Sequence, residues 1–165
     1  MKNDMRITYP LWQMAGIFII MGFVLLVGYA ATVNTFSDGG FGFEISINGT
    51  SGILLNAMLV IVVLYLSMFY YRISKHNKRM PKHKISMTTY KPQEYLEDDE
   101  LFQDLTKQAT KKVYTFFAWA LPIMAAVYML FPISKTWMIS GILLLAAGQY
   151  WIFYRTIKKF MSSVD

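Results

Sequence analysis

The sequence has no cysteine and few charged residues, and both absences narrow what the protein can be. Without cysteine there are no disulfides, thiol nucleophiles, iron–sulfur clusters or thiolate zinc sites. Charged types make up 16% of the chain, whereas an ordinary soluble domain has about a quarter, and apolar types make up 55%. This composition excludes a disordered chain and argues against a soluble globular enzyme.

Long windows without any charged residue predict membrane-spanning helices. A bilayer core about 30 Å thick needs about 20 residues of helix. A buried helix of a soluble bundle would show a polar face at a period of about 3.6 residues, and the run Val60 to Leu64 shows none. We therefore expect four transmembrane helices, at about residues 11–33, 53–71, 113–132 and 136–154.

The basic residues predict the orientation of these helices. Fifteen of the sixteen lysines and arginines precede the first span, lie between the second and third, or follow the fourth, and only Lys135 lies on the other side. Cytoplasmic segments carry the excess of lysine and arginine, so both termini are expected in the cytoplasm. The first apolar run is longer than the 7–15 residues typical of a signal-peptide core, so we expect it to be retained as a span. The predicted fold is an all-α membrane protein with four transmembrane helices arranged as two antiparallel hairpins.

The loop at residues 34–52 is expected outside the cytoplasm and contains a strand-like pattern. Phe43, Ile45 and Ile47 alternate with Glu44 and Ser46, which is the period of a short strand. Glycine-containing turn signals flank this stretch. A β-hairpin over the end of the bundle is one interpretation, and an irregular loop is the other.

The cytoplasmic segment at residues 72–112 begins with a cluster of basic residues and no acidic residue. Such a cluster next to a span attracts anionic lipid headgroups by about 1 kcal/mol per basic residue near the surface. The simpler interpretation is that it only sets the topology. Nucleic-acid binding is not expected, because the adjacent bilayer competes for the same charges. The candidate headgroup-binding residues are Arg72, Lys75, Lys78, Arg79, Lys82 and Lys84.

The rest of this segment predicts an amphipathic helix that runs from about Gln93 into the third span. Acidic residues at 94–100 favour the positive end of a helix, and Leu101, Phe102 and Leu105 form an apolar stripe. We name this stripe the docking stripe, because it must be covered either by the protein's own bundle or by a partner. The acidic residues lack the spacing of a calcium loop, so we expect them to pair with the basic cluster and expect no metal or cofactor.

The predicted spans contain no aspartate, glutamate, lysine, arginine or histidine. Ionisable groups inside the membrane are the usual mark of proton relays, ion pathways and membrane catalysis. No catalytic sequence motif occurs either, so we expect no enzymatic activity. Ser67 and Gln149 lie at similar depth in the second and fourth spans, so they are candidates for an interhelical hydrogen bond; the alternative is that they line a substrate path.

The general form, four short spans around a charged cytoplasmic segment, resembles that of small multi-pass membrane proteins of bacteria. This resemblance is one of topology and implies no functional residues. We expect residues 1–165 to form a single integral domain in the cell membrane, acting as an accessory, regulatory or immunity-type protein. Its expected partners are anionic lipids and either a membrane protein or further copies of the chain. The alternative is an oligomeric transporter or pore subunit, which would need a continuous polar stripe.

Overall fold

The computed structural model describes residues 5–30, 32–34, 44–46, 49–81, 84–85 and 100–164. This part of the chain consists of four long helices and two three-residue strands. Each helix is long and apolar enough to cross a membrane, which confirms the prediction of four helices with the length and composition of membrane spans. The helices are α1 (Met5–Ala30), α2 (Gly49–Arg79), α3 (Glu100–Leu130) and α4 (Lys135–Val164).

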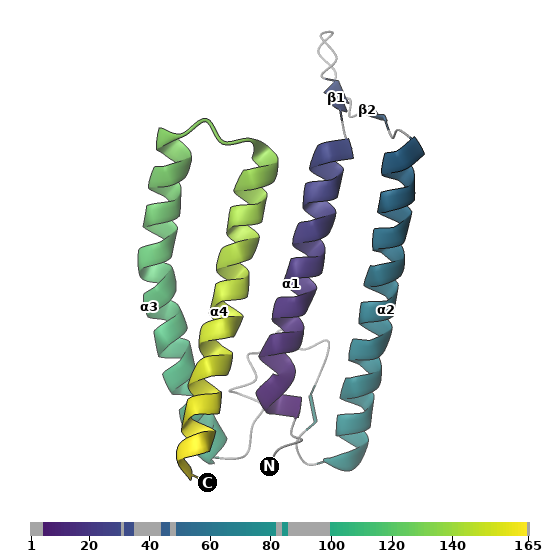
Figure 1. Ribbon diagram of the computed structural model, residues 1–165. Coiled ribbons are helices and arrows are strands. Elements are labelled where there is room, and N and C mark those ends of the chain that lie inside the picture. The colour runs from purple at the N-terminus through teal and green to yellow at the C-terminus, as the bar shows by residue number, and fades with distance from the viewer. Residues whose placement is uncertain are drawn as a thin grey trace.

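The four helices lie side by side in the order α3, α4, α1, α2 (Figure 1). The extensive contacts follow this order: α4 packs on α3 and α1, and α1 packs on α2. Residues 131–134 join α3 to α4. The start of α1, the end of α2, the start of α3 and the end of α4 all lie at one end of the molecule. We call it the basic end, because every described lysine and arginine except Lys135 lies toward it.

The first helix differs at both ends from the prediction of a helix at residues 11–33. It begins at Met5 and ends at Ala30, because Thr32–Asn34 form strand β1. The β-branched residues Thr32 and Val33 favour a strand, and an uncharged window marks apolar sequence without specifying helix. Strand β1 pairs antiparallel with β2 (Glu44–Ser46), which falls within the stretch whose alternation favoured a strand.

Helices α2 and α4 continue past their apolar windows into basic sequence. Lysine and arginine are good helix formers, and cations near a helix C-terminus interact favourably with its dipole. A change from apolar to charged sequence therefore ends the membrane window without ending the helix. The 31 residues of α2 make a helix about 46 Å long, which exceeds the bilayer core of about 30 Å. Of the helix expected from Gln93, the described part begins at Glu100, and residues 93–99 lie outside the described residues.

Most of the buried apolar side chains lie at the basic end. Met5, Ile73 and Ile85 form one cluster, against which Tyr9, Trp12 and Phe69 pack. Further along the same end, Phe102, Leu105, Ala109 and Ile157 are buried as well. The spans instead expose large apolar side chains, for example Ile53 and Leu64 of α2 at 71% and 62%. Such a surface is unusual in water and fits a lipid environment.

Candidate functional site

A cavity of about 380 Å³ lies at the end of α2 and has a partly polar lining. Its cationic side chains are Lys78 and Lys84, and Ser74 and Asn77 add further polar groups. Tyr70 and the buried residues Ile73 and Ile85 complete the lining. The cavity therefore combines two positive charges with an apolar wall.

Asn77 holds the chain that follows α2 against the helix. Its Nδ2 donates a hydrogen bond to the Ile85 carbonyl oxygen at 3.0 Å, and the Ile85 amide donates to Asn77 Oδ1 at 2.8 Å. A side-chain amide carries a donor and an acceptor side by side, so it pairs with a peptide group as another peptide would. Ile85 is 5% exposed within the cluster of Met5 and Ile73. These contacts hold Lys84 on the same cavity as Lys78.

The described members of the candidate headgroup-binding set are all exposed, and Lys82 lies outside the described residues. The Arg72 guanidinium lies 5.9 Å from the Trp12 ring centroid, and the Lys75 ammonium lies 5.8 Å from that of Tyr71. Within the described part of the chain, no member of the set forms an ion pair. Of the members of the set that the structure describes, Lys78 and Lys84 are the two that line the cavity.

The docking stripe lies at the start of α3, where Phe102 and Leu105 are 4% and 1% exposed. The side chain of Leu101 lies outside the described residues. Since the structure contains a single chain, the atoms that cover Phe102 and Leu105 belong to the protein itself. One of the covering groups is the guanidinium of Arg6 in α1, which lies 4.7 Å from the Phe102 ring centroid. This cation–π contact ties the start of α1 to the start of α3.

Arg6 and Asn77 were not singled out from the sequence. Arg6 contributed only to the count of cytoplasmic charges, and nothing near it in the sequence indicates an aromatic partner in α3. Asn77 had a weak signal, because it stands near a helix end that Pro81 follows, and asparagine often pairs with backbone groups where helices end.

Ser67 and Gln149 are not brought together. Ser67 is exposed on α2, and α1 lies between α2 and α4 (Figure 1). Two tyrosines do form interhelical hydrogen bonds. Tyr65 Oη donates to the Trp12 carbonyl oxygen at 2.5 Å, and Tyr128 Oη donates to the Met138 carbonyl oxygen at 2.7 Å.

A glycine on the facing helix makes room for each of these tyrosines. A Cβ atom at Gly16 would lie 2.8 Å from Tyr65 Oη, and one at Gly141 would collide with Tyr128 Oη. Small residues let membrane helices approach closely, and here they also let a hydroxyl reach a backbone carbonyl. The sequence shows that these helices contain glycines and tyrosines, but which glycine faces which tyrosine becomes evident only once the helices are placed.

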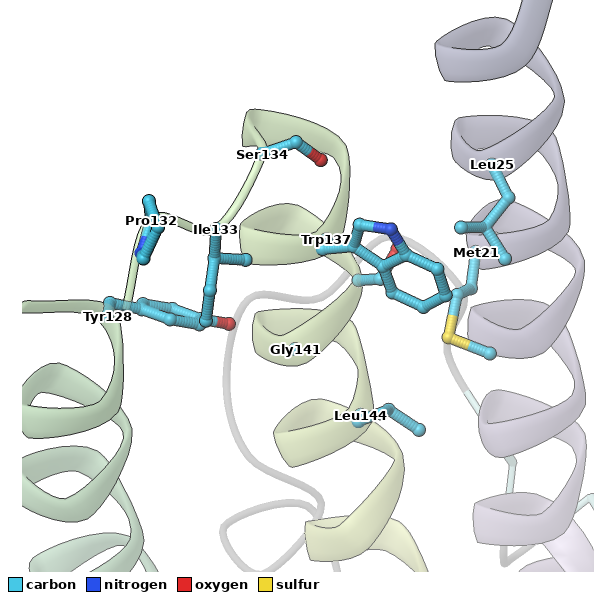
Figure 2. Close-up of a pocket in the computed structure, with 10 residues that line it drawn as sticks. Met21, Leu25, Tyr128, Pro132, Ile133, Ser134, Trp137, Gly141 and Leu144 are labelled. Carbon is cyan, nitrogen blue, oxygen red and sulfur yellow. The ribbon is translucent and has the colours of Figure 1, made fainter. Parts of the chain in front are cut away.

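A second, mainly apolar cavity of about 760 Å³ lies at the end of the molecule opposite the basic end. Figure 2 shows the Trp137 indole between α4 and α1, on the side of Met21 and Leu25. Tyr128 and Ile133 line the cavity from the side of α3. Within the part of the chain that the structure describes, no three histidine, aspartate or glutamate side chains converge on a common point.

No protein-family model matches this sequence, and no curated protein or solved structure is significantly similar to the chain.

Proposed function

We propose that the protein is a non-enzymatic accessory, regulatory or immunity-type protein of the cell membrane. It acts through helix packing and through its basic end, which lies at the anionic lipid surface of the cytoplasmic leaflet. In this proposal α1–α2 and α3–α4 are two antiparallel transmembrane hairpins, and both termini are cytoplasmic. The first turns of α3 are the cytoplasmic amphipathic helix, with Phe102 and Leu105 on its covered face.

The exposure of the basic side chains at the end of α2 carries this proposal; their predicted pairing with the acidic residues at 94–99 lies outside the described residues. Arg72, Lys75, Lys78, Arg79 and Lys84 are exposed, and none is neutralised by an ion pair within the described residues. Such a cluster lowers its free energy beside anionic lipid by about 1 kcal/mol per residue near the surface. The length of α2 supports the same placement, because about 16 Å of it exceeds the bilayer core.

Reporter fusions test the orientation. A periplasm-active reporter placed after Asp165 should stay silent, and the same reporter inserted within residues 34–52 should be active. A matched pair of cytoplasm-active reporters should give the reverse pattern. Equal signals at the two sites would contradict the topology, and an active periplasmic reporter after Asp165 would contradict the cytoplasmic terminus.

Purification from native membranes tests the accessory role. We expect one membrane-protein partner to copurify in a fixed ratio with the tagged full chain, and a tagged unrelated four-span protein should not retain it. Reconstitution into liposomes tests the alternative of a pore or transporter subunit. Ion or solute flux that depends on the purified chain would contradict the accessory role, because that role requires no conduction path.

A further inference from the structure

The cavity at the end of α2 suits a specific ligand chemistry. We propose that it binds one phosphate-bearing anion, namely the headgroup of a single anionic phospholipid. This inference rests on the proposed function and deepens it, because it assigns Lys78 and Lys84 to a defined site. The other basic residues then attract the anionic membrane surface without binding a particular lipid.

The charges of the cavity fit a phosphate group. Lys78 and Lys84 both line it, and neither forms an ion pair within the described part of the chain. A lysine ammonium binds phosphate as a compact positive charge with three hydrogen-bond donors. The Ser74 hydroxyl lies on the same wall and offers a further donor.

The position of the cavity along α2 fits a lipid headgroup. Ser74 and Lys78 follow Tyr71, the last residue of the expected span, by three and seven residues. At about 1.5 Å per residue they stand about 5 and 10 Å beyond the hydrocarbon edge. The headgroup layer is about 5–8 Å thick on each side, and flexible lysine stems reach back into it. Tyr70 and Ile73 line the cavity nearer the hydrocarbon core, where the glycerol and the first methylene groups of a lipid would lie.

The size of the cavity fits one headgroup. Its volume of about 380 Å³ lies at the small end of the range of about 300–1,000 Å³ for ligand pockets. Lys84 stands beyond the end of α2 and next to Ile85, whose backbone is bonded twice to Asn77. Asn77 is therefore a positioning residue: it places the second cation without contributing charge itself.

Native mass spectrometry of the purified full chain in detergent tests the site. The protein is titrated with phosphatidylglycerol or with phosphatidylcholine, and the fraction that retains one lipid is measured. We expect the affinity for phosphatidylglycerol to exceed that for phosphatidylcholine by about tenfold or more. Equal retention of the two lipids would overturn the proposal.

Two charge-matched double variants separate the site from general attraction. Lys78→Gln with Lys84→Gln should weaken phosphatidylglycerol binding by about tenfold or more. Lys75→Gln with Arg79→Gln removes the same charge from the same end of α2 but outside the cavity, and should weaken binding by no more than about threefold. Equal losses in the two variants would show that the charge acts diffusely and would overturn the proposal.

Asn77→Leu tests the positioning without changing any charge. We expect it to remove the preference for phosphatidylglycerol over phosphatidylcholine while the helical circular dichroism and thermal unfolding stay close to those of the parent. A retained preference would contradict the role of Asn77. If the variant unfolds, the two lysine variants still decide the proposal, because both change only exposed side chains.

Inorganic phosphate distinguishes a lipid from a free anion. Phosphate in millimolar excess should leave phosphatidylglycerol bound, because it cannot contact Tyr70 and Ile73 as a lipid would. Displacement at concentrations comparable to the lipid would overturn the assignment to a lipid. These measurements use purified protein and do not depend on orientation, so failure of the site and failure of the proposed topology are distinguishable.

Discussion

At the basic end, Leu105 and Ile157 are 1% and 0% exposed, whereas the most apolar 18-residue windows of α1, α2 and α3 contain no buried residue. The two regions are stabilised by different contacts. In water, removing apolar surface from solvent drives packing. In lipid the surroundings are as apolar as the side chains, so close approach at glycines and interhelical hydrogen bonds carry more of the stability. The placement of buried residues thus follows the proposed boundary between water and membrane.

The largest effect is expected at the basic end, from Leu105→Ala. Removing a fully buried leucine side chain costs about 2–5 kcal/mol of unfolding free energy, because the lost contacts leave a cavity. Unfolding in mixed micelles and protease cleavage near the start of α3 measure this loss. The control is Gln108→Ala, which changes an exposed residue one turn away. If both variants were equally stable, the start of α3 would not be packed as the structure has it.

A glycine substitution in the membrane should come next. Gly141→Val places a side chain where Tyr128 Oη lies, so α3 and α4 must separate or Tyr128 must leave its hydrogen bond. Overpacking of this kind costs about 1–3 kcal/mol, measured as the unfolding free energy in mixed micelles. At Gly49 an added Cβ meets nothing within 4 Å, so Gly49→Val is the matched control. A neutral Gly141→Val would show that close approach is not what joins α3 and α4.

Smaller effects are expected from the two tyrosine hydroxyls. Tyr65→Phe and Tyr128→Phe each remove one interhelical hydrogen bond, which is worth about 0.6 kcal/mol and at most about 2 kcal/mol. The two contacts lie at different helix interfaces, so the losses should add in the double variant. Tyr114→Phe is the control, because Tyr114 is 76% exposed and makes no hydrogen bond within the described residues. Equal effects of all three changes would contradict the assigned role of the hydroxyls.

The smallest effect should come from the surface ion pair of α3. Lys107 Nζ lies 3.3 Å from Asp104 Oδ1, and both side chains are mostly exposed. Lys107→Gln should cost about 0.5 kcal/mol or less, and high salt should abolish the difference from the parent. A loss comparable to that of Leu105→Ala would show that charge pairing, rather than apolar burial, stabilises the basic end.

The helices could be predicted from the sequence, because their apolar windows are long and free of charge. The ends of the helices were harder to predict. Thr32 and Val33 fit an uncharged span but form a strand, and α2 continues through basic residues as far as Arg79, beyond the predicted end of the span. The order of the helices in space could not be predicted from the sequence either. Ser67 and Gln149 were paired by depth alone, and depth does not reveal that α1 lies between α2 and α4.

The candidate site, too, could be predicted only in part. The basic residues at the end of α2 were evident from composition, but which of them share a cavity depends on the fold of the chain after Arg79. Lys78 and Lys84 line the same cavity because Asn77 binds the backbone of Ile85. No local sequence pattern predicts the contact between Asn77 and Ile85. The contact between Arg6 and Phe102 joins two helices far apart in the sequence, so it too required the placed helices.

The order of the helices in space has a consequence for how the chain can be rearranged. The first and last helices, α1 and α4, are neighbours at the centre of the row, and the start of α1 and the end of α4 lie at the same end of the molecule (Figure 1). The chain between α2 and α3 connects the two outermost helices instead. A circular permutation that links the end of α4 to the start of α1 and opens the chain between α2 and α3 would preserve every extensive helix contact. The two helices that are farthest apart in the sequence therefore pack directly against each other.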